Sequence, residues 1–290
     1  LGYAGVVPPS VAPGDTLQVL NLGGVIGRCT SANPEVGPPF DCEVLGALLE
    51  FPALGDRIGR PATIVGGPVQ PCAKLQPGAP VVYVAGSCMN AGKTVAASEL
   101  IRGLSRAGVK VAAGKLTGVA LLRDSLSMRD AGAQNVLTFN DAGAACTSAG
   151  NAAGIANGIL SALRAGEPDV IVAELGDGLL GEYGVQAILG DPELAACAAA
   201  IVVAAPDPVA CWGAHRLLAD RYGLAVTVFT GPATDNEVGR RYLKNELGVP
   251  AHNARRDGPG LLGVVRAVLG GAAGAAGDRS PAVTAGNGAS

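Results

Sequence analysis

The stretch from Gly86 to Thr94 has the residue types and spacing of a phosphate-binding loop. An uninterrupted apolar run at 81–85 precedes it, and a segment with helical periodicity at 94–107 follows it. A glycine-rich loop at such a strand-to-helix junction directs several backbone N–H groups at one anion. We therefore predict a nucleotide site formed by the consecutive residues Gly86, Ser87, Cys88, Met89, Asn90, Ala91, Gly92, Lys93, Thr94 and Val95.

Lys93 and Thr94 are the two side chains of this loop that are suited to phosphate chemistry. The lysine would neutralise the β- and γ-phosphates, and the threonine hydroxyl would ligate Mg²⁺. The spacing departs from the common Gly-x-x-x-x-Gly-Lys-Thr pattern, because five residues separate Gly86 from Gly92 and Ser87 stands at the usual first glycine. The alternative is a glycine-rich turn with a solvent-exposed lysine, but the buried strand before the loop favours a phosphate site.

Lys115 and Glu174 follow two other apolar runs that we predict to be strands. Lys115 would lie just past the end of the strand at 109–113, where its charge could stabilise a phosphoryl group during transfer. The alternative for Lys115 is a surface lysine. Glu174 ends the run at 170–173, and a carboxylate at that depth requires a cation such as Mg²⁺. The alternative for Glu174 is an acid that caps the following turn.

Asp124 and Asp177 complete the set of candidate site residues. Asp124 is a second candidate ligand for Mg²⁺, and as an alternative it could cap the helix that follows it. Asp177 stands in the sequence Gly176-Asp177-Gly178, where it could orient a nucleophile or stabilise a turn. The predicted catalytic residues are thus Lys93, Lys115 and Asp177, and the predicted metal ligands are Thr94, Asp124 and Glu174.

The elements that position these residues alternate between strands and helices. Continuous apolar strands in such an alternation indicate an α/β fold with a mostly parallel sheet covered by helices on both faces. Ligands of these sheets bind at the carboxyl ends of the strands. Strands are predicted at 81–85, 109–113, 170–173, 200–204 and 225–229, and helices at 94–107, 149–165, 209–222 and 236–247.

The chain divides by composition into three parts. Residues 1–78 hold eleven of the 20 prolines and short apolar runs between turns, which predicts a small β-rich domain. Residues 79–270 form the predicted nucleotide-binding α/β domain. Residues 271–290 are rich in Gly, Ala and Ser without periodicity, which predicts a flexible tail.

Charge and cysteine usage narrow the partners and the compartment. The net charge of −3 and the lack of a basic stripe argue against nucleic acid as a partner. Apolar segments are short and interrupted, so no membrane span is expected. Seven widely spaced cysteines in a chain of 290 residues indicate a reducing, cytoplasmic compartment.

The loop and two later segments resemble dethiobiotin synthetase-like P-loop proteins. The Gly86–Thr94 spacing matches that family's Gly-Thr-Asp-Thr-x-Val-Gly-Lys-Thr loop, and 114–118 is similar to its Lys-Pro-Val-x-x-Gly segment, whose lysine contacts phosphate. Residues 169–178 are similar to the strand whose glutamate ligates Mg²⁺ in that family. The resemblance covers about 81–255 and implies Mg²⁺, ATP, a small-molecule acceptor and a homodimer.

Two other resemblances lie within the same broad P-loop class. The run at 123–133 is similar to a stretch of the molybdopterin-guanine-dinucleotide accessory GTP-binding proteins. The run at 117–122, with the Glu174 strand, resembles a P-loop family that includes D-glutamate N-acetyltransferases. The signature lysine of the MinD/ParA ATPases would fall at Cys88, so a partitioning ATPase is not supported.

These observations predict an ATP-dependent kinase or ligase that transfers a phosphoryl group to a small carboxylate, carbamate or amine. One alternative is an accessory or switch protein that hydrolyses GTP or ATP. Another alternative is a coenzyme A-dependent N-acyltransferase that uses the loop to hold the phosphates of coenzyme A. ATP is preferred to GTP because residues 229–235, after the strand at 225–229, carry no guanine-selecting Asn-Lys-x-Asp motif.

Overall fold

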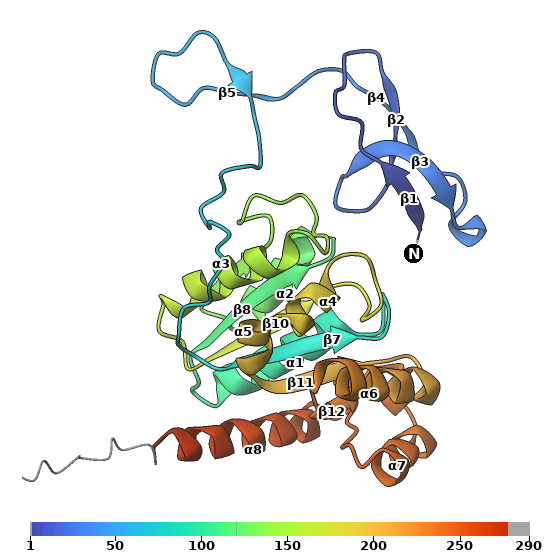
Figure 1. The fold of residues 1–290 in the computed structure, drawn as a ribbon, viewed down its shortest axis with the longest axis vertical. Helices are drawn as coiled ribbons and strands as arrows, with labels where there is room; N and C mark the ends of the chain where they lie inside the picture. The colour runs from blue at the N-terminus through green and yellow to red at the C-terminus, as the bar shows by residue number, and fades with distance from the viewer. Residues whose placement is uncertain (1, 120, 278–290) are drawn as a thin grey trace, which may run out of the picture.

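The computed structural model describes residues 2–119 and 121–277. Its main part is a six-stranded parallel sheet in the order β12-β11-β7-β10-β8-β9, which confirms the predicted α/β fold (Figure 1). The strands are β7 (Val81–Gly86), β8 (Val111–Thr117), β9 (Asn135–Thr138), β10 (Val170–Leu175), β11 (Ala198–Ala204) and β12 (Val228–Thr230).

Helices cover both faces of this sheet. Successive side chains of a strand point to opposite faces, so neighbouring residues of one strand pack against different helices. Val82 and Val84 of β7 belong to a cluster with α1, α2 and α8, whereas Tyr83 belongs to a cluster with α3 to α7. The helices are α1 (Lys93–Arg106), α2 (Leu122–Asp130), α3 (Ala152–Arg164), α4 (Val185–Gly190), α5 (Pro192–Ala196), α6 (Pro208–Tyr222), α7 (Glu237–Glu246) and α8 (Gly258–Gly277), with the short 3₁₀ turns η1 (Pro34–Val36) and η2 (Pro232–Thr234).

The last helix bears on two predictions made from composition. Helix α8 continues to Gly277, beyond residue 270, at which we placed the end of the α/β domain. The rest of the predicted flexible tail, 278–290, lies outside the described residues. Within the part of the chain that the structure describes, no helix is long and apolar enough to cross a membrane.

The direction of the strands brings the predicted site residues to one edge of the sheet. Strand β7 lies between β11 and β10. The strands β8, β9 and β10 lie on one side of β7, and β11 and β12 lie on the other, so the strand order changes direction beside β7. Glu174 of β10 is in register with Val84 on one side and with Lys115 on the other. This is the topological switch point at which open α/β sheets bind their ligands.

The N-terminal region forms two small antiparallel sheets, as its composition predicts. The first has the order β1-β3-β2-β4, and the second pairs β5 with β6. Leu17 is the one large apolar side chain that is buried among residues 2–66, whereas Phe40, Leu48 and Ile58 are largely exposed. The strands are β1 (Tyr3–Val6), β2 (Thr16–Val19), β3 (Ile26–Ala32), β4 (Asp41–Glu43), β5 (Leu49–Glu50) and β6 (Arg60–Pro61).

Residues 67–79, which we call the strap, connect this region to the sheet and pack along α3. Val69 is buried in the core cluster that includes α3, and its N–H donates to the Asp141 carbonyl at 3.0 Å. The Cys72 N–H donates to the Gly154 carbonyl at 3.0 Å. Part of the predicted N-terminal domain therefore contributes to the core of the α/β sheet.

Two glycines of α3 allow a direct test of this packing. A Cβ on Gly158 would lie 2.4 Å from the Gln70 carbonyl oxygen, whereas a Cβ on Gly154 would meet nothing nearer than 3.7 Å. We expect Gly158→Ala to destabilise the fold by about 1–3 kcal/mol, because the strap must shift. Gly154→Ala should stabilise it by up to about 1 kcal/mol through helix propensity. Urea unfolding of both variants checks this, and equal effects would contradict the close packing.

Candidate functional site

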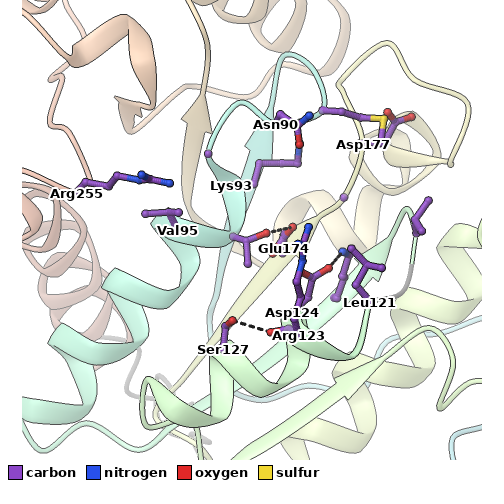
Figure 2. A pocket seen from close by; sticks show the side chains of 16 residues that line it. Asn90, Lys93, Val95, Leu121, Arg123, Asp124, Ser127, Glu174, Asp177 and Arg255 are labelled. Atoms are coloured by element: carbon purple, nitrogen blue, oxygen red, sulfur yellow. Dashed lines mark hydrogen bonds and ion pairs between the residues drawn. The ribbon is translucent and has the colours of Figure 1, made fainter. Parts of the chain in front are cut away.

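The predicted phosphate-binding loop joins the end of β7 to the start of α1 (Figure 2). Asn90 and Gly92 have left-handed φ angles of 60° and 104°, which turn the chain into the helix. Gly86 leaves room for the lysine, because a Cβ there would lie 2.9 Å from Lys93 Cγ and Cδ. The loop therefore has the local geometry that the sequence predicts.

Lys93 is buried beneath this loop, and its Nζ donates a hydrogen bond to the Cys88 carbonyl at 2.8 Å. Burial lowers the pKa of Lys93, and the carboxylates of Glu174 and Asp177 oppose that shift. The alternative of a solvent-exposed lysine is therefore wrong. The ammonium is held where the backbone of the loop converges, which suits it to a phosphate.

Glu174 and Thr94 meet directly across the end of the sheet. The Thr94 hydroxyl donates to Glu174 Oε1 at 3.1 Å, and Glu174 is 2% exposed. The other carboxylate oxygen, Oε2, is buried and has no hydrogen-bond partner among the described residues. Burial raises the pKa of Glu174, while nearby Lys115 acts in the opposite direction. A buried carboxylate oxygen without a hydrogen-bond partner, beside a phosphate-binding loop, is a ligand that a bound cation would satisfy.

Lys115 forms a buried ion pair with Asp124 of α2. Strand β8 runs to Thr117, so Lys115 lies within the strand and not past its end as predicted. The neighbouring Leu116 packs into the α3 cluster on one face, whereas Lys115 meets the carboxylate on the other. Asp124 lies in the first turn of α2, whose N-cap is Leu121, so the capping alternative for Asp124 is wrong.

Asp177 lies in the loop after β10, at the edge of the same site. Its φ is 79°, its side chain is buried, and its Oδ2 atom has no hydrogen-bond partner among the described residues. The preceding Gly176 accepts a 2.8 Å hydrogen bond from the Thr117 hydroxyl through its carbonyl. This bond ties the loop to the end of β8.

One cavity of about 520 Å³ brings these groups together. It contains all the predicted catalytic and metal-binding residues and part of the predicted loop. Ser87 and Cys88 line a separate, mostly apolar cavity of about 800 Å³ beside α6. Figure 2 shows Asn90 and Asp177 at one end of the first cavity and Asp124 and Arg123 at the other. Its lining comprises Met89, Asn90, Gly92, Lys93, Thr94, Val95, Lys115, Val119, Leu121, Arg123, Asp124, Ser127, Glu174, Gly176, Asp177 and Arg255.

Comparisons with known proteins show limited similarity. No protein-family model and no curated protein matches the chain. Among solved structures, chloroplast FtsY from Physcomitrella patens is 14% identical over 68% of this chain and 67% of its own, with a TM-score of 0.42. A DUF1611 family protein from Anabaena variabilis is 14% identical over 68% of this chain and 62% of its own, with a TM-score of 0.46. HypB from Helicobacter pylori, solved in complex with nickel, is 16% identical over 67% of this chain and 86% of its own, with a TM-score of 0.43.

The chain itself has the strand, loop and helix arrangement of P-loop nucleotide-binding proteins, set at the switch point of a parallel sheet. The similarity to the DUF1611 protein spans less than two thirds of that protein.

The cavity is also lined by two arginines, Arg123 and Arg255, which are not among the residues predicted from the sequence. Arg123 precedes Asp124 and lies in the run that resembles the molybdopterin-related proteins, so its position carried a signal. Arg255 follows β12 by more than twenty residues and belongs to no motif. With these two the cavity has four basic side chains facing three carboxylates, namely Lys93, Lys115, Arg123 and Arg255 against Asp124, Glu174 and Asp177.

The donor set fits Mg²⁺ that arrives with phosphate. The described ranges, 2–119 and 121–277, contain no group of three or more His, Cys, Asp and Glu side chains that could hold a metal. Mg²⁺ does not need such a group, because it keeps several waters and is held by one or two carboxylates together with phosphate oxygens. Glu174 and Thr94 suit that role. Asp124 is paired with Lys115 through its Oδ2 atom, so a role as a metal ligand would require it to share its charge between Lys115 and the metal.

A smaller cavity of about 340 Å³ adjoins the first and shares Asn90, Gly92, Val95 and Arg255 with it. Its far wall carries Asp235, whose Oδ1 accepts a 2.8 Å hydrogen bond from the Asn253 side chain. The sequence analysis did not select Asn253, which is buried and anchors this corner. The position beside the loop and the mixed polar lining suit the base of a nucleotide.

Proposed function

We propose that the protein is an ATP-dependent kinase or ligase, which transfers the γ-phosphoryl group of Mg²⁺-bound ATP to a small carboxylate, carbamate or amine. The observation that carries this proposal is that Glu174 accepts a hydrogen bond from Thr94 through Oε1 while its buried Oε2 has no partner among the described residues, directly beside the phosphate-binding loop. A coenzyme A site has no need of a metal and would leave Glu174 without a cation. We also propose a cytoplasmic homodimer.

Lys93 and Lys115 supply the positive charge in this proposal. Lys93 binds the β- and γ-phosphates, and Lys115 leaves Asp124 to neutralise the charge that develops on the transferred group. Bound Mg²⁺ would polarise the γ-phosphate and orient it. Because the metal offsets the carboxylates of Glu174 and Asp124, the four basic side chains of the cavity can balance the triphosphate, which leaves the charge of Asp177 without a counter-charge.

The adjoining cavity would hold the adenine ring. Asp235 is exposed there as a hydrogen-bond acceptor, and adenine offers an amino group to it. Guanine offers N–H donors to the same carboxylate, and titration with ATP and GTP distinguishes the two bases. Residues 229–235 carry no Asn-Lys-x-Asp motif, which supports ATP over GTP.

A second candidate function is a nucleotide-hydrolysing switch. The loop after β10 that carries Asp177 continues to Tyr183, whose phenol interacts with the Asn21 side chain of the N-terminal region. A change in this loop on hydrolysis would therefore reach the N-terminal sheets. This candidate predicts slow turnover that a protein partner accelerates, whereas the enzyme predicts turnover that a small acceptor accelerates.

Calorimetric titration with ATP, GTP and acetyl coenzyme A, each with and without Mg²⁺, tests the proposal. We expect ATP to bind with a Kd that Mg²⁺ lowers by at least about tenfold, because Glu174 and Thr94 gain their cation. Preference for GTP would favour the switch protein. Binding of acetyl coenzyme A alone, without dependence on Mg²⁺, would contradict phosphoryl transfer.

A further inference from the structure

Asp177 combines three features that together are costly for an aspartate. Its backbone is left-handed with φ of 79°, its side chain is 8% exposed, and its Oδ2 atom is without a hydrogen-bond partner among the described residues. A left-handed non-glycine residue and a buried, unpaired carboxylate oxygen each reduce stability. Such costs collect at functional sites, where the surrounding structure enforces them.

Glycines on both sides hold Asp177 in place. A Cβ on Gly176 would lie 2.2 Å from the Thr117 carbonyl oxygen, and one on Gly178 would lie 2.6 Å from that of Ser87. The loop is thus pressed between β8 and the phosphate-binding loop. A Cβ on Gly181 would lie 1.7 Å from Asp177 Oδ2, so the carboxylate occupies space that any larger residue at 181 would fill.

The carboxylate lines the 520 Å³ cavity together with Lys93 and Lys115. Figure 2 places Asp177 near Asn90, at the end of the cavity opposite Asp124, with Lys93 and Glu174 between them. In the proposed complex the γ-phosphate lies between the two lysines. Asp177 then stands beside the phosphate on the side away from the Asp124 carboxylate.

We propose that Asp177 is the general base of the reaction and that the acceptor attacks through a hydroxyl or an uncharged amine. This inference rests on the proposed function and revises its acceptor class: it keeps the amine, removes the carboxylate and the carbamate, and adds the hydroxyl. The acceptor's lone pair forms a bond to the γ-phosphorus, the bond from that phosphorus to the bridging oxygen breaks, and its electron pair leaves with ADP. The acceptor's proton passes to the Asp177 carboxylate.

A carboxylate or carbamate acceptor does not fit this arrangement. At neutral pH its attacking oxygen carries no proton for Asp177 to accept. Its negative charge would also be repelled by Asp177 in a poorly solvated cavity. Water, in contrast, is the smallest acceptor with a proton, so hydrolysis of ATP reports on Asp177 before the natural acceptor is known.

Three substitutions in the full chain separate the charge, the backbone and the position of this carboxylate. Asp177→Asn tolerates the left-handed backbone and removes the base, so we expect kcat for Mg²⁺-ATP hydrolysis to fall about 10²- to 10⁴-fold. Asp177→Gly suits φ of 79°, so its unfolding midpoint should not fall while its activity does, and added formate should restore part of that activity. Gly181→Ala keeps the charge but displaces the carboxylate, so kcat should fall at least about tenfold.

Gly263→Ala is the control, because a Cβ at that position meets nothing within 4 Å. It should match the wild type, and all variants should bind Mg²⁺-ATP with a Kd within about threefold of the wild type. Ethanolamine and glycerol should accelerate ADP formation by the wild type, whereas propionate should not.

Several results would overturn the inference while the proposed function stands. Wild-type hydrolysis by Asp177→Asn would exclude a general base, and a higher Mg²⁺ requirement in that variant would make Asp177 a metal ligand. If propionate accelerated ADP formation by both the wild type and Asp177→Asn, the acceptor would be a carboxylate and not a hydroxyl or an amine. A wild type that binds Mg²⁺-ATP but forms no ADP with water, ethanolamine or glycerol would also contradict the proposed acceptor class. Failure of the wild type to bind Mg²⁺-ATP would instead remove the proposed function itself.

Discussion

Lys93→Ala will bind Mg²⁺-ATP at least about 100-fold more weakly than the wild type. The lysine ammonium sits under the phosphate-binding loop, 2.8 Å from the Cys88 carbonyl oxygen, and no other lysine of the cavity comes from this loop. A hydrogen bond to a charged group is worth about 1.5–3 kcal/mol, and tenfold in affinity corresponds to about 1.4 kcal/mol. Two such bonds to phosphate oxygens therefore account for the expected loss, which calorimetry will measure.

The matched control is Lys244→Ala, because Lys244 is exposed on α7, away from the cavity. We expect that variant to bind as the wild type does. Burial lowers the pKa of Lys93, which means that its charge costs stability at neutral pH, so Lys93→Ala should unfold at no lower urea concentration. If a folded Lys93→Ala protein bound Mg²⁺-ATP with unchanged affinity, the loop would not be part of the nucleotide site.

The phosphate-binding loop could be predicted because its determinants are local. An apolar run of five residues, a glycine-rich loop and a lysine at the first helical position follow one another along the chain, and the structure keeps that order in β7 and α1. Glu174 could be predicted for a similar reason, since it follows an uninterrupted run of four apolar residues, although the strand itself continues to Leu175. In both cases the sequence neighbours are also the spatial neighbours.

The features that sequence reasoning missed depend on contacts between distant segments. The sequence predicts Lys115 past the end of its strand, because a charged residue in a buried strand is costly unless a partner such as Asp124 meets it. Nothing local to Arg255 indicates that it reaches the cavity. The short strand β9 and helices α4 and α5 have too few residues to show a period, so tertiary packing decides them.

The strap shows the same limit in the N-terminal region. Its composition assigns it to the small N-terminal domain, yet Val69 enters the core because Gly158 of α3 allows the backbones to approach. A glycine in a helix sequence does not by itself indicate which segment packs closely against it, because that segment is distant in the sequence. The composition of residues 1–78 therefore indicated small sheets correctly but gave no sign of this contact.

Glu174→Gln will separate the metal requirement from the fold. We expect Mg²⁺ no longer to strengthen ATP binding and kcat to fall about 10²- to 10³-fold, because the neutral amide is a poor ligand for a hard cation. The amide oxygen can still accept the hydrogen bond from Thr94, so the local structure should persist. Calorimetry with and without Mg²⁺ and steady-state hydrolysis measure the two effects, with the exposed Glu246→Gln as the control.

The same substitution should stabilise the protein without metal, with a defined pH dependence. Burial raises the pKa of Glu174 above its ordinary value near 4.5, so the folded state favours the protonated carboxyl. That contribution to stability is present below pH 4.5 and is lost as the pH rises through the folded pKa, where the buried charge becomes costly. Glu174→Gln should therefore raise the free energy of unfolding by about 1 kcal/mol at pH 7 and by much less at pH 4. A variant less stable than the wild type at pH 7 in EDTA would show that Glu174 is a structural residue whose charge is already satisfied within the fold.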